Sequence, residues 1–81
     1  MNDYDKLIKM LTDYDIGYET KMYDITTDSW AEYHFGSFCK KRAYCIVLEA
    51  KTNNKVNGYN GFQARVVFDD AKKFHHIDIY E

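Results

Sequence analysis

Residues 43–50, Ala-Tyr-Cys-Ile-Val-Leu-Glu-Ala, form the longest run of strand-favouring side chains in the sequence. Because side chains alternate along a strand, Tyr44, Ile46 and Leu48 would point to one face of a sheet and their neighbours to the other. Both faces of this stretch are largely apolar, which is typical of a central strand covered on one face and partly shielded on the other. We therefore expect the rest of the chain to pack around it.

The other strands are predicted from alternation and from the turn residues between them. The natural partner of the central strand is residues 62–68, after a connection, residues 51–61, that contains Asn57-Gly58 and Asn60-Gly61. Asn-Gly pairs favour tight hairpin turns, and two such pairs leave the register open. Alternating patterns predict three more strands, at residues 18–23, 30–35 and 74–80.

One amphipathic helix is predicted near the N-terminus, from a cap at Asn2 or Asp3 to about residue 14. Gly17 is expected to stop it in a left-handed conformation. The apolar side chains recur with the spacing of one helix face, at Tyr4, Leu7, Ile8, Leu11 and Tyr14. This stripe needs a surface to pack on, and we expect that surface to be the sheet.

These elements predict a single domain over residues 1–81 of the α+β class: an N-terminal helix packed on one face of a five-stranded antiparallel sheet, in two layers. The opposite face of the sheet would be partly open. The side chains expected on that open face are Tyr23, Trp30, His34, Cys45 and Val47.

The composition favours a protein that presents a surface to a partner. Eight Tyr, five Phe and one Trp are more rings than the core of so small a domain needs, and exposed aromatic side chains are enriched at protein interfaces. Residues 1–34 also carry eight acids against three lysines. A contiguous acidic surface would favour a basic partner or mimicry of nucleic acid, and the alternative is an ordinary solvated surface.

The patterns for catalysis and metal binding are weak. A basic cluster beside Cys39 would lower the pKa of its thiol and His34 is near in sequence, but no third group is in place to orient them. The Cys39-x5-Cys45 spacing lacks the close pairing of structural zinc ligands, and His75 and His76 would point to opposite faces of a strand. We therefore predict no catalytic residue, metal site or cofactor, and we do not expect an enzyme.

Two cysteines are too few for a disulfide framework, and we expect both to be reduced thiols of a cytoplasmic protein. The start of the chain does not have the pattern of a signal peptide, and no apolar run approaches the ~20 residues of a membrane span. We expect no association with a membrane.

Lys40, Lys41 and Arg42 form the densest positive cluster and would contact the phosphate backbone if the protein bound nucleic acid. The net charge of −2 argues against direct nucleic-acid binding as the main function. A small nucleic-acid-binding accessory or regulatory protein is therefore the alternative prediction. A third is a structural module that self-associates, as a homodimer, through an edge strand.

The two ends of the chain carry a resemblance. Residues 3–20, Asp-Tyr-Asp-Lys-Leu-Ile-Lys-Met-Leu-Thr-Asp-Tyr-Asp-Ile-Gly-Tyr-Glu-Thr, look like the opening helix and first strand of small proteins from phages and mobile elements of low-GC Gram-positive bacteria. Residues 66–81, Val-Val-Phe-Asp-Asp-Ala-Lys-Lys-Phe-His-His-Ile-Asp-Ile-Tyr-Glu, look like their closing hairpin. Such proteins are similar in size and style to anti-CRISPR and other anti-defence inhibitors, which bind a host protein, often over its nucleic-acid site.

The main functional prediction combines this resemblance with the acidic N-terminal half and the surplus of aromatic side chains. We expect a non-enzymatic phage or mobile-element protein that binds and inhibits a bacterial defence protein, such as a CRISPR effector, in the cytoplasm of the host bacterium. Trp30 and Tyr33 would be its apolar anchors, since Trp and Tyr dominate interface energetics. Asp24, Asp28 and Glu32 would contact a basic site on the target.

Overall fold

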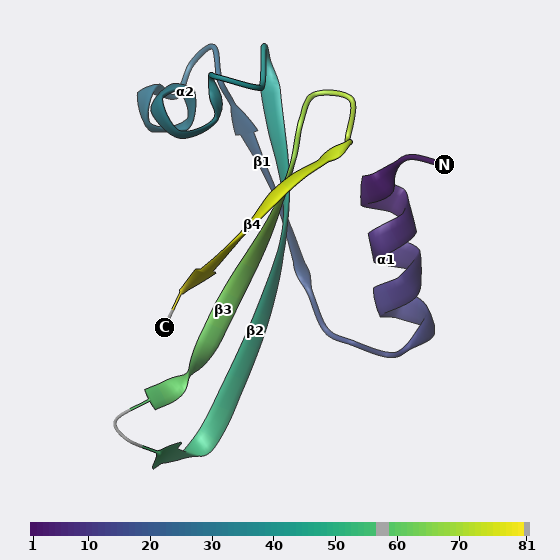
Figure 1. Ribbon diagram of the computed structural model, residues 1–81, viewed down its shortest axis with the longest axis vertical. Coiled ribbons are helices and arrows are strands. Elements are labelled where there is room, and N and C mark those ends of the chain that lie inside the picture. The colour runs from purple at the N-terminus through teal and green to yellow at the C-terminus, as the bar shows by residue number, and fades with distance from the viewer. Residues whose placement is uncertain (57–58, 81) are drawn as a thin grey trace.

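The computed structural model describes the backbone of residues 1–56 and 59–80, and the side-chain surroundings of residues 1–49 and 63–79. The described elements, in chain order, are α1 (Asp3–Asp13), β1 (Glu19–Asp24), α2 (Ser29–Phe35), β2 (Arg42–Val56), β3 (Tyr59–Phe68) and β4 (Phe74–Tyr80). The strands form one antiparallel sheet in the order β1-β2-β3-β4 (Figure 1). The predicted α+β class and antiparallel sheet are confirmed, with four described strands in place of five.

Helix α1 begins at the Asn2 cap and ends in a Schellman motif, in which the Ile16 N–H donates to the Leu11 carbonyl oxygen at 2.8 Å. The left-handed residue of this motif is Asp15, with φ of 55°. The predicted left-handed stop at Gly17 is therefore wrong. Aspartate can take this conformation because its short polar side chain tolerates the left-handed region.

Residues 30–35, predicted to be a strand, belong to helix α2. Asp28 caps this helix, because its Oδ1 accepts hydrogen bonds from the backbone N–H groups of Trp30 (3.0 Å) and Ala31 (3.2 Å). Ala31 and Phe35, one helical turn apart, are the buried positions. A Cβ at Gly36 would collide with the backbone of the preceding turn, so a glycine is needed where the helix ends.

The long hairpin of β2 and β3 is the predicted central pair. Its register runs from Tyr44 opposite Phe68 to Lys51 opposite Gly61. Most of the predicted connection, residues 51–61, is strand, because β2 continues to Val56 and β3 begins at Tyr59. The Asn57-Gly58 pair lies outside the described residues.

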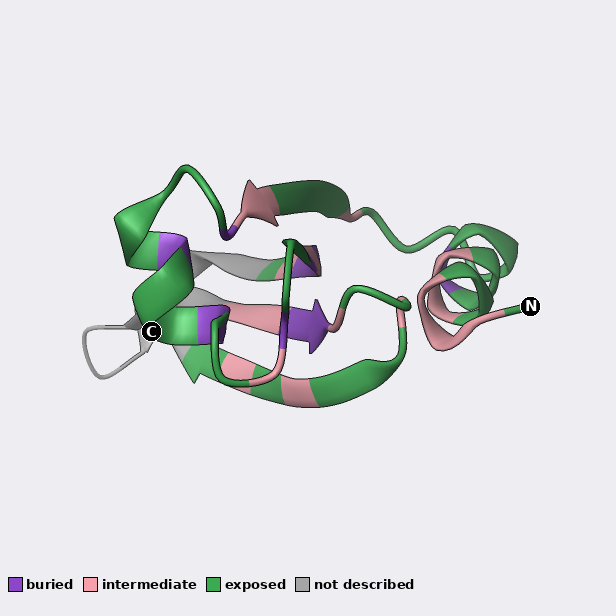
Figure 2. Cartoon of the chain, turned by 90° about the horizontal axis from the view of Figure 1, so that it is seen from above, coloured by how far each residue is buried: buried purple, intermediate pink, exposed green. Residues whose placement is uncertain are grey.

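Two clusters of buried side chains lie on opposite faces of the sheet. On one face, Leu11 of α1 packs against Ile46, Val66 and Phe68. On the other, α2 and the turn after it cover a second cluster made of Ile25, Ala31, Phe35, Cys39, Ala43, Cys45 and Val67. Figure 2 shows the sheet between the two helices. The predicted packing of the N-terminal helix on one face of the sheet is confirmed. The prediction of two layers with an open second face is wrong at the α2 end, because α2 covers the sheet there.

The first turn of α1 is fastened to the start of β4. Asp3 Oδ2 accepts a hydrogen bond from the Phe74 N–H at 2.8 Å, and the Tyr4 N–H donates to the Lys72 carbonyl oxygen at 3.1 Å. The Lys72 ammonium also lies 5.0 Å from the Tyr4 ring. These contacts fix the turn between β3 and β4 relative to the helix.

Candidate functional site

The outer surface of α2 presents the two predicted aromatic anchors to solvent. Tyr33 is 86% exposed and Trp30 is 43% exposed, whereas Ala31 and Phe35 on the opposite side of the same helix are 0% and 1% exposed. Glu32, between Ala31 and Tyr33, is also exposed. A helix held by its buried side therefore carries an aromatic and acidic outer surface.

Trp30 has a structural role besides its exposure. Its ring centroid lies 5.3 Å from that of Tyr23 and 5.6 Å from that of Phe35. The Arg65 guanidinium lies 5.6 Å from the Trp30 ring centroid and 5.5 Å from that of Phe35. Trp30 is therefore partly a core residue, and of the two predicted anchors Tyr33 has the ring that is mainly exposed.

Two of the three predicted acids build the local structure. Asp24 Oδ1 accepts hydrogen bonds from the Thr26 hydroxyl (2.6 Å) and the Thr26 N–H (2.9 Å), and these bonds, the hydroxyl first, lower the pKa of Asp24. Asp28 is the N-cap of α2. Glu32 has no hydrogen bond or ion pair of its side chain within the described residues. A test of charge at this surface should therefore use Glu32.

A β-bulge in β4 brings His75 and His76 to the same side of the sheet. β4 pairs Phe74 with Phe68 and His76 with Val67, which leaves His75 as the extra residue. The Nδ1 atoms of the two imidazoles lie 2.8 Å apart. The prediction that the two histidines alternate faces is wrong, because a bulge interrupts the two-residue period of the strand.

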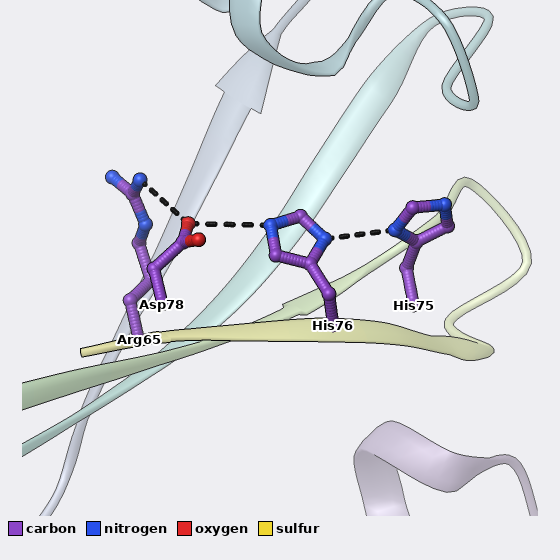
Figure 3. Close-up of polar contacts among 4 residues, drawn as sticks. All are labelled: Arg65, His75, His76 and Asp78. Atoms are coloured by element: carbon purple, nitrogen blue, oxygen red, sulfur yellow. Dashed lines mark hydrogen bonds and ion pairs between the residues drawn. The ribbon is translucent and has the colours of Figure 1, made fainter.

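The two histidines end a chain of polar contacts that sequence reasoning missed (Figure 3). Arg65 Nη2 donates to Asp78 Oδ2 at 3.1 Å, and His76 Nε2 lies 3.2 Å from the same oxygen. The Arg65 side chain is only 14% exposed. Partial desolvation raises the pKa of Asp78, but the hydrogen bond from Arg65 and the charge and hydrogen bond of His76 outweigh it, so that the pKa lies below its ordinary value.

The donor and acceptor roles in this series of polar contacts follow from which atoms carry a hydrogen. An ionised carboxylate only accepts, so His76 Nε2 carries a hydrogen toward Asp78. One of the two facing Nδ1 atoms must donate and the other accept, so at most one of them carries a hydrogen. The pair can hold one positive charge and keep its hydrogen bond, whereas two charges would break it. The Phe38 ring, stacked on His75 at 3.7 Å, holds the outer imidazole in place.

Both cysteines are buried thiols. Desolvation, followed by the charges of Asp70 and Asp69, raises the pKa of Cys39 to about 11. Desolvation also raises the pKa of Cys45 to about 11. The expectation that the neighbouring basic residues lower the pKa of Cys39 is wrong, because burial, followed by the Asp70 and Asp69 carboxylates, raises it. Cys39 Sγ instead donates to the Phe68 carbonyl oxygen at 3.9 Å.

The basic cluster is fastened through its backbone to the turn between β3 and β4. The N–H groups of Lys40, Lys41 and Arg42 donate to the Asp70 carboxylate at 2.6, 2.7 and 2.9 Å. Desolvation raises the pKa of Asp70, but these three donors outweigh it and bring the pKa below its ordinary value. The three basic side chains are exposed. Their own carboxylate neighbour reduces the positive potential that a phosphate backbone would meet.

A shallow hollow of about 500 Å³ lies beside α2, lined by Ile25, Thr26, Glu32, Gly36, Cys39 and Lys40. Among the described residues, no group of three or more His, Cys, Asp or Glu side chains is arranged to hold a metal ion. Neither α1 nor α2, the helices of the described chain, is long and apolar enough to cross a bilayer.

Comparison with models of known protein families, with curated proteins and with solved structures finds no match.

The sequence contains a signal for α2 that alternation concealed. Asp28, a strong N-cap residue, and Gly36 bracket a seven-residue segment, and Ala31 and Phe35 have the i, i+4 spacing of a helix face. The bulge has no comparable signal, because nothing in His-His distinguishes an extra residue from a regular one. The contact of Arg65 with Asp78 depends on the pairing of β3 with β4, where the two residues lie opposite each other.

Proposed function

We propose that this protein acts by binding another protein through the outer surface of α2, without catalysing a reaction. The observation that carries the proposal is the 86% exposure of Tyr33 on a helix whose other side is buried in a core cluster. An exposed tyrosine offers a large contact area and a hydroxyl at a small cost in conformational entropy. A buried Phe35 underneath keeps the helix in position, so little ordering is left to be done on binding.

The acidic character of this surface defines the chemistry of the partner. Glu32 is exposed beside Tyr33, and Asp24 and Asp28 precede it in the chain. An exposed negative charge on a contact surface attracts a partner with a positive patch and speeds its association. We propose that Tyr33 and part of Trp30 supply contact area and that Glu32 supplies the charge that selects a basic site.

A bacterial defence protein, with a CRISPR effector first, is the partner that we propose. Such effectors hold nucleic acid in positively charged channels, so an acidic surface that carries tyrosine fits the site that the nucleic acid would occupy. The resemblance of the two chain ends to small phage and mobile-element proteins supports the same partner. The activity would then be inhibition by occlusion, in the cytoplasm of the host bacterium.

The proposal is tested by adding the purified protein to a panel of purified CRISPR effectors and measuring DNA cleavage and binding. We expect at least one effector to lose cleavage, and Glu32→Lys to weaken its binding by about tenfold or more, because a like charge then faces the basic site. Glu19→Lys, which reverses an exposed acid on β1, is the matched control. If Glu32→Lys and Glu19→Lys weakened binding equally, α2 would be excluded as the binding surface. If no effector in the panel were inhibited, the proposed class of partner would be excluded.

A gel shift with DNA and RNA at two salt concentrations separates this function from nucleic-acid binding. Direct binding would weaken steeply with salt and would be lost when Lys40, Lys41 and Arg42 are changed to Ala. We expect no salt-dependent shift from the protein alone. A shift that the triple variant abolishes would favour the accessory or regulatory alternative.

A further inference from the structure

The two edges of the sheet differ in how they face solvent. β1 carries charged side chains at Glu19, Lys21 and Asp24, and charges on an edge strand discourage pairing with another chain. β4, the other edge of the described sheet, carries exposed Ile77 (51%) and Ile79 (69%). An edge strand with exposed β-branched side chains is suited to receive another strand.

An apolar groove continues this edge toward helix α1. The groove has a volume of about 340 Å³ and lies where α1 leaves the β4 side of the sheet uncovered. Its lining includes Leu7, Met10, Val66, Phe68, Phe74 and Ile77. Phe74 is 47% exposed and Met10 is 45% exposed. Apolar area is therefore left in water beside an open strand edge, and its burial would stabilise an association.

We propose that β4 pairs with β4 of a second copy of this chain, in an antiparallel arrangement with the twofold axis at Ile77. Such a pair would join two four-stranded sheets into one, with both α1 helices on the same face. Ile77 would lie opposite Ile77 of the second copy, on the face that α1 covers. We propose a second copy as the partner because this register places the His76 imidazole of each copy opposite the Asp78 carboxylate of the other.

The positions of His76 and Asp78 on β4 select this register. With Ile77 on the axis, His76 lies opposite Asp78 of the second copy, and Asp78 lies opposite the other His76. This follows because the residue numbers of any two opposite positions in an antiparallel pair have the same sum. Moving the axis by one residue would place Asp78 opposite its own copy, or His76 opposite its own copy. Like charges directly opposite each other, such as two Asp78 carboxylates, destabilise a strand pair. Of these three registers, only the one centred on Ile77 places Asp78 opposite His76.

The start of β4 leaves this register free to form. The Phe74 N–H already donates to Asp3, so the first residue of the strand is occupied by α1. The pairing centred on Ile77 uses residues 76–78 at its centre and needs no change in the first turn of α1. The surface also differs from the outer side of α2, so the dimer and the proposed partner can bind at the same time.

Sedimentation over about a hundredfold range of concentration tests the association, since dimer formation follows mass action. We expect the protein to dimerise and Ile79→Lys to weaken the dimer by at least about tenfold, because a lysine on the edge strand opposes pairing. Met22→Lys is the matched control, since Met22 is a 54% exposed apolar residue on the other edge strand. A chain that stays monomeric, or a dimer that Met22→Lys disrupts and Ile79→Lys does not, would overturn the proposal.

Crosslinking with a short bifunctional thiol reagent tests the register. Ile77→Cys places two thiols directly across the axis, about 5 Å apart at Cβ, and should give a covalent dimer. Ile79→Cys places its two thiols four positions apart along the strands, about 13 Å, which a short reagent does not bridge. The wild-type thiols, Cys39 and Cys45, are buried and serve as the blank. Crosslinking at position 79 and not at 77, or equal crosslinking at both, would contradict this register. Tyr33→Ala should leave both measurements unchanged.

Discussion

The two faces of the sheet are covered in different ways. On one face, the regular helix α1 packs Leu11 against apolar side chains of β2 and β3. On the other, the seven-residue helix α2 packs Phe35 over a face that also holds the partly buried Arg65 and its carboxylate partner Asp78. The first face is a simple hydrophobic contact. The second combines aromatic rings with paired charges, and it supports the surface that we propose to be functional.

This difference shows how a short helix can be held firmly. Seven residues are too few for a helix to be stable on its own, because nucleation is costly. α2 is fixed by the Asp28 cap at its start and by Phe35 in the core at its end. Its exposed residues are therefore held in one orientation, whereas those of a fraying helix would not be.

Truncating the buried side chains under the two helices should cause the largest losses of stability. Phe35→Ala should cost about 3–5 kcal/mol and Leu11→Ala about 2–5 kcal/mol, because each removes a buried side chain and leaves a cavity. Urea denaturation followed by the fluorescence of Trp30 gives both values. Tyr33→Ala, at an exposed position, should change stability by less than about 0.5 kcal/mol. A cost for Phe35→Ala as small as that of Tyr33→Ala would mean that α2 does not cover the sheet.

The paired charges should give the next largest effect. Asp78→Asn should destabilise the protein by about 1–2 kcal/mol, because it removes the carboxylate charge that the partly buried Arg65 contacts, and solvent screens part of the loss. Asp5→Asn, on the exposed side of α1, should cost less than about 0.5 kcal/mol. Equal costs in denaturation would show that the contact of Arg65 with Asp78 contributes nothing specific to this face.

The same carboxylate gives the stability a dependence on pH. The pKa of Asp78 is lower in the folded chain than in the unfolded chain, so its contribution is complete above the ordinary value of about 4 and is lost as the pH falls through the folded value. The urea midpoint should therefore fall on acidification below about pH 4, and less steeply in Asp78→Asn than in the wild type. The pKa of Asp70 is lowered in the same direction, so part of the slope should remain in the variant.

The two helix caps should give the smallest effect on stability. Asp28→Ala and Asn2→Ala should each cost about 1 kcal/mol, because each removes a side-chain acceptor from a helix start. Only Asp28→Ala should change the fluorescence of Trp30 in the folded protein, since Trp30 begins the helix that Asp28 caps. A change of the same size in Asn2→Ala would show that the two faces are coupled more closely than their separate clusters indicate.

The hydrophobic pattern was sufficient to predict the α1 face, and it failed on the α2 face for physical reasons. The stripe of α1 spans three turns, so a helical period could be recognised, and residues 43–50 alternate over eight positions. In residues 30–35, Ala31 and Phe35 satisfy both the helical period and strand alternation, so the pattern of this short segment predicts a strand as readily as a helix. Placing it in a helix removes the fifth strand and covers the face that was expected to be open.

Within the candidate site, Tyr33 is exposed and its role as an anchor stays a prediction, whereas the roles of Asp24 and Asp28 depended on knowing the local fold. Both are acids that turns and helix starts use for their own backbone, so their charge alone did not reveal that they are structural. The contact between His75 and His76 could not be predicted, because it requires a bulge whose position depends on how β3 and β4 pair.

We propose that the protein meets its partner through the outer surface of α2. This proposal is tested most directly by comparing two exposed tyrosines, Tyr33 on α2 and Tyr14 at the end of α1, which are 86% and 73% exposed. Binding to the inhibited effector should weaken by about tenfold or more in Tyr33→Ala and remain unchanged in Tyr14→Ala, since an interface anchor costs more than about 1 kcal/mol when truncated. If Tyr33→Ala bound the effector with full affinity and Tyr14→Ala lost affinity, the binding surface would lie on α1 and the proposed role of α2 would be wrong.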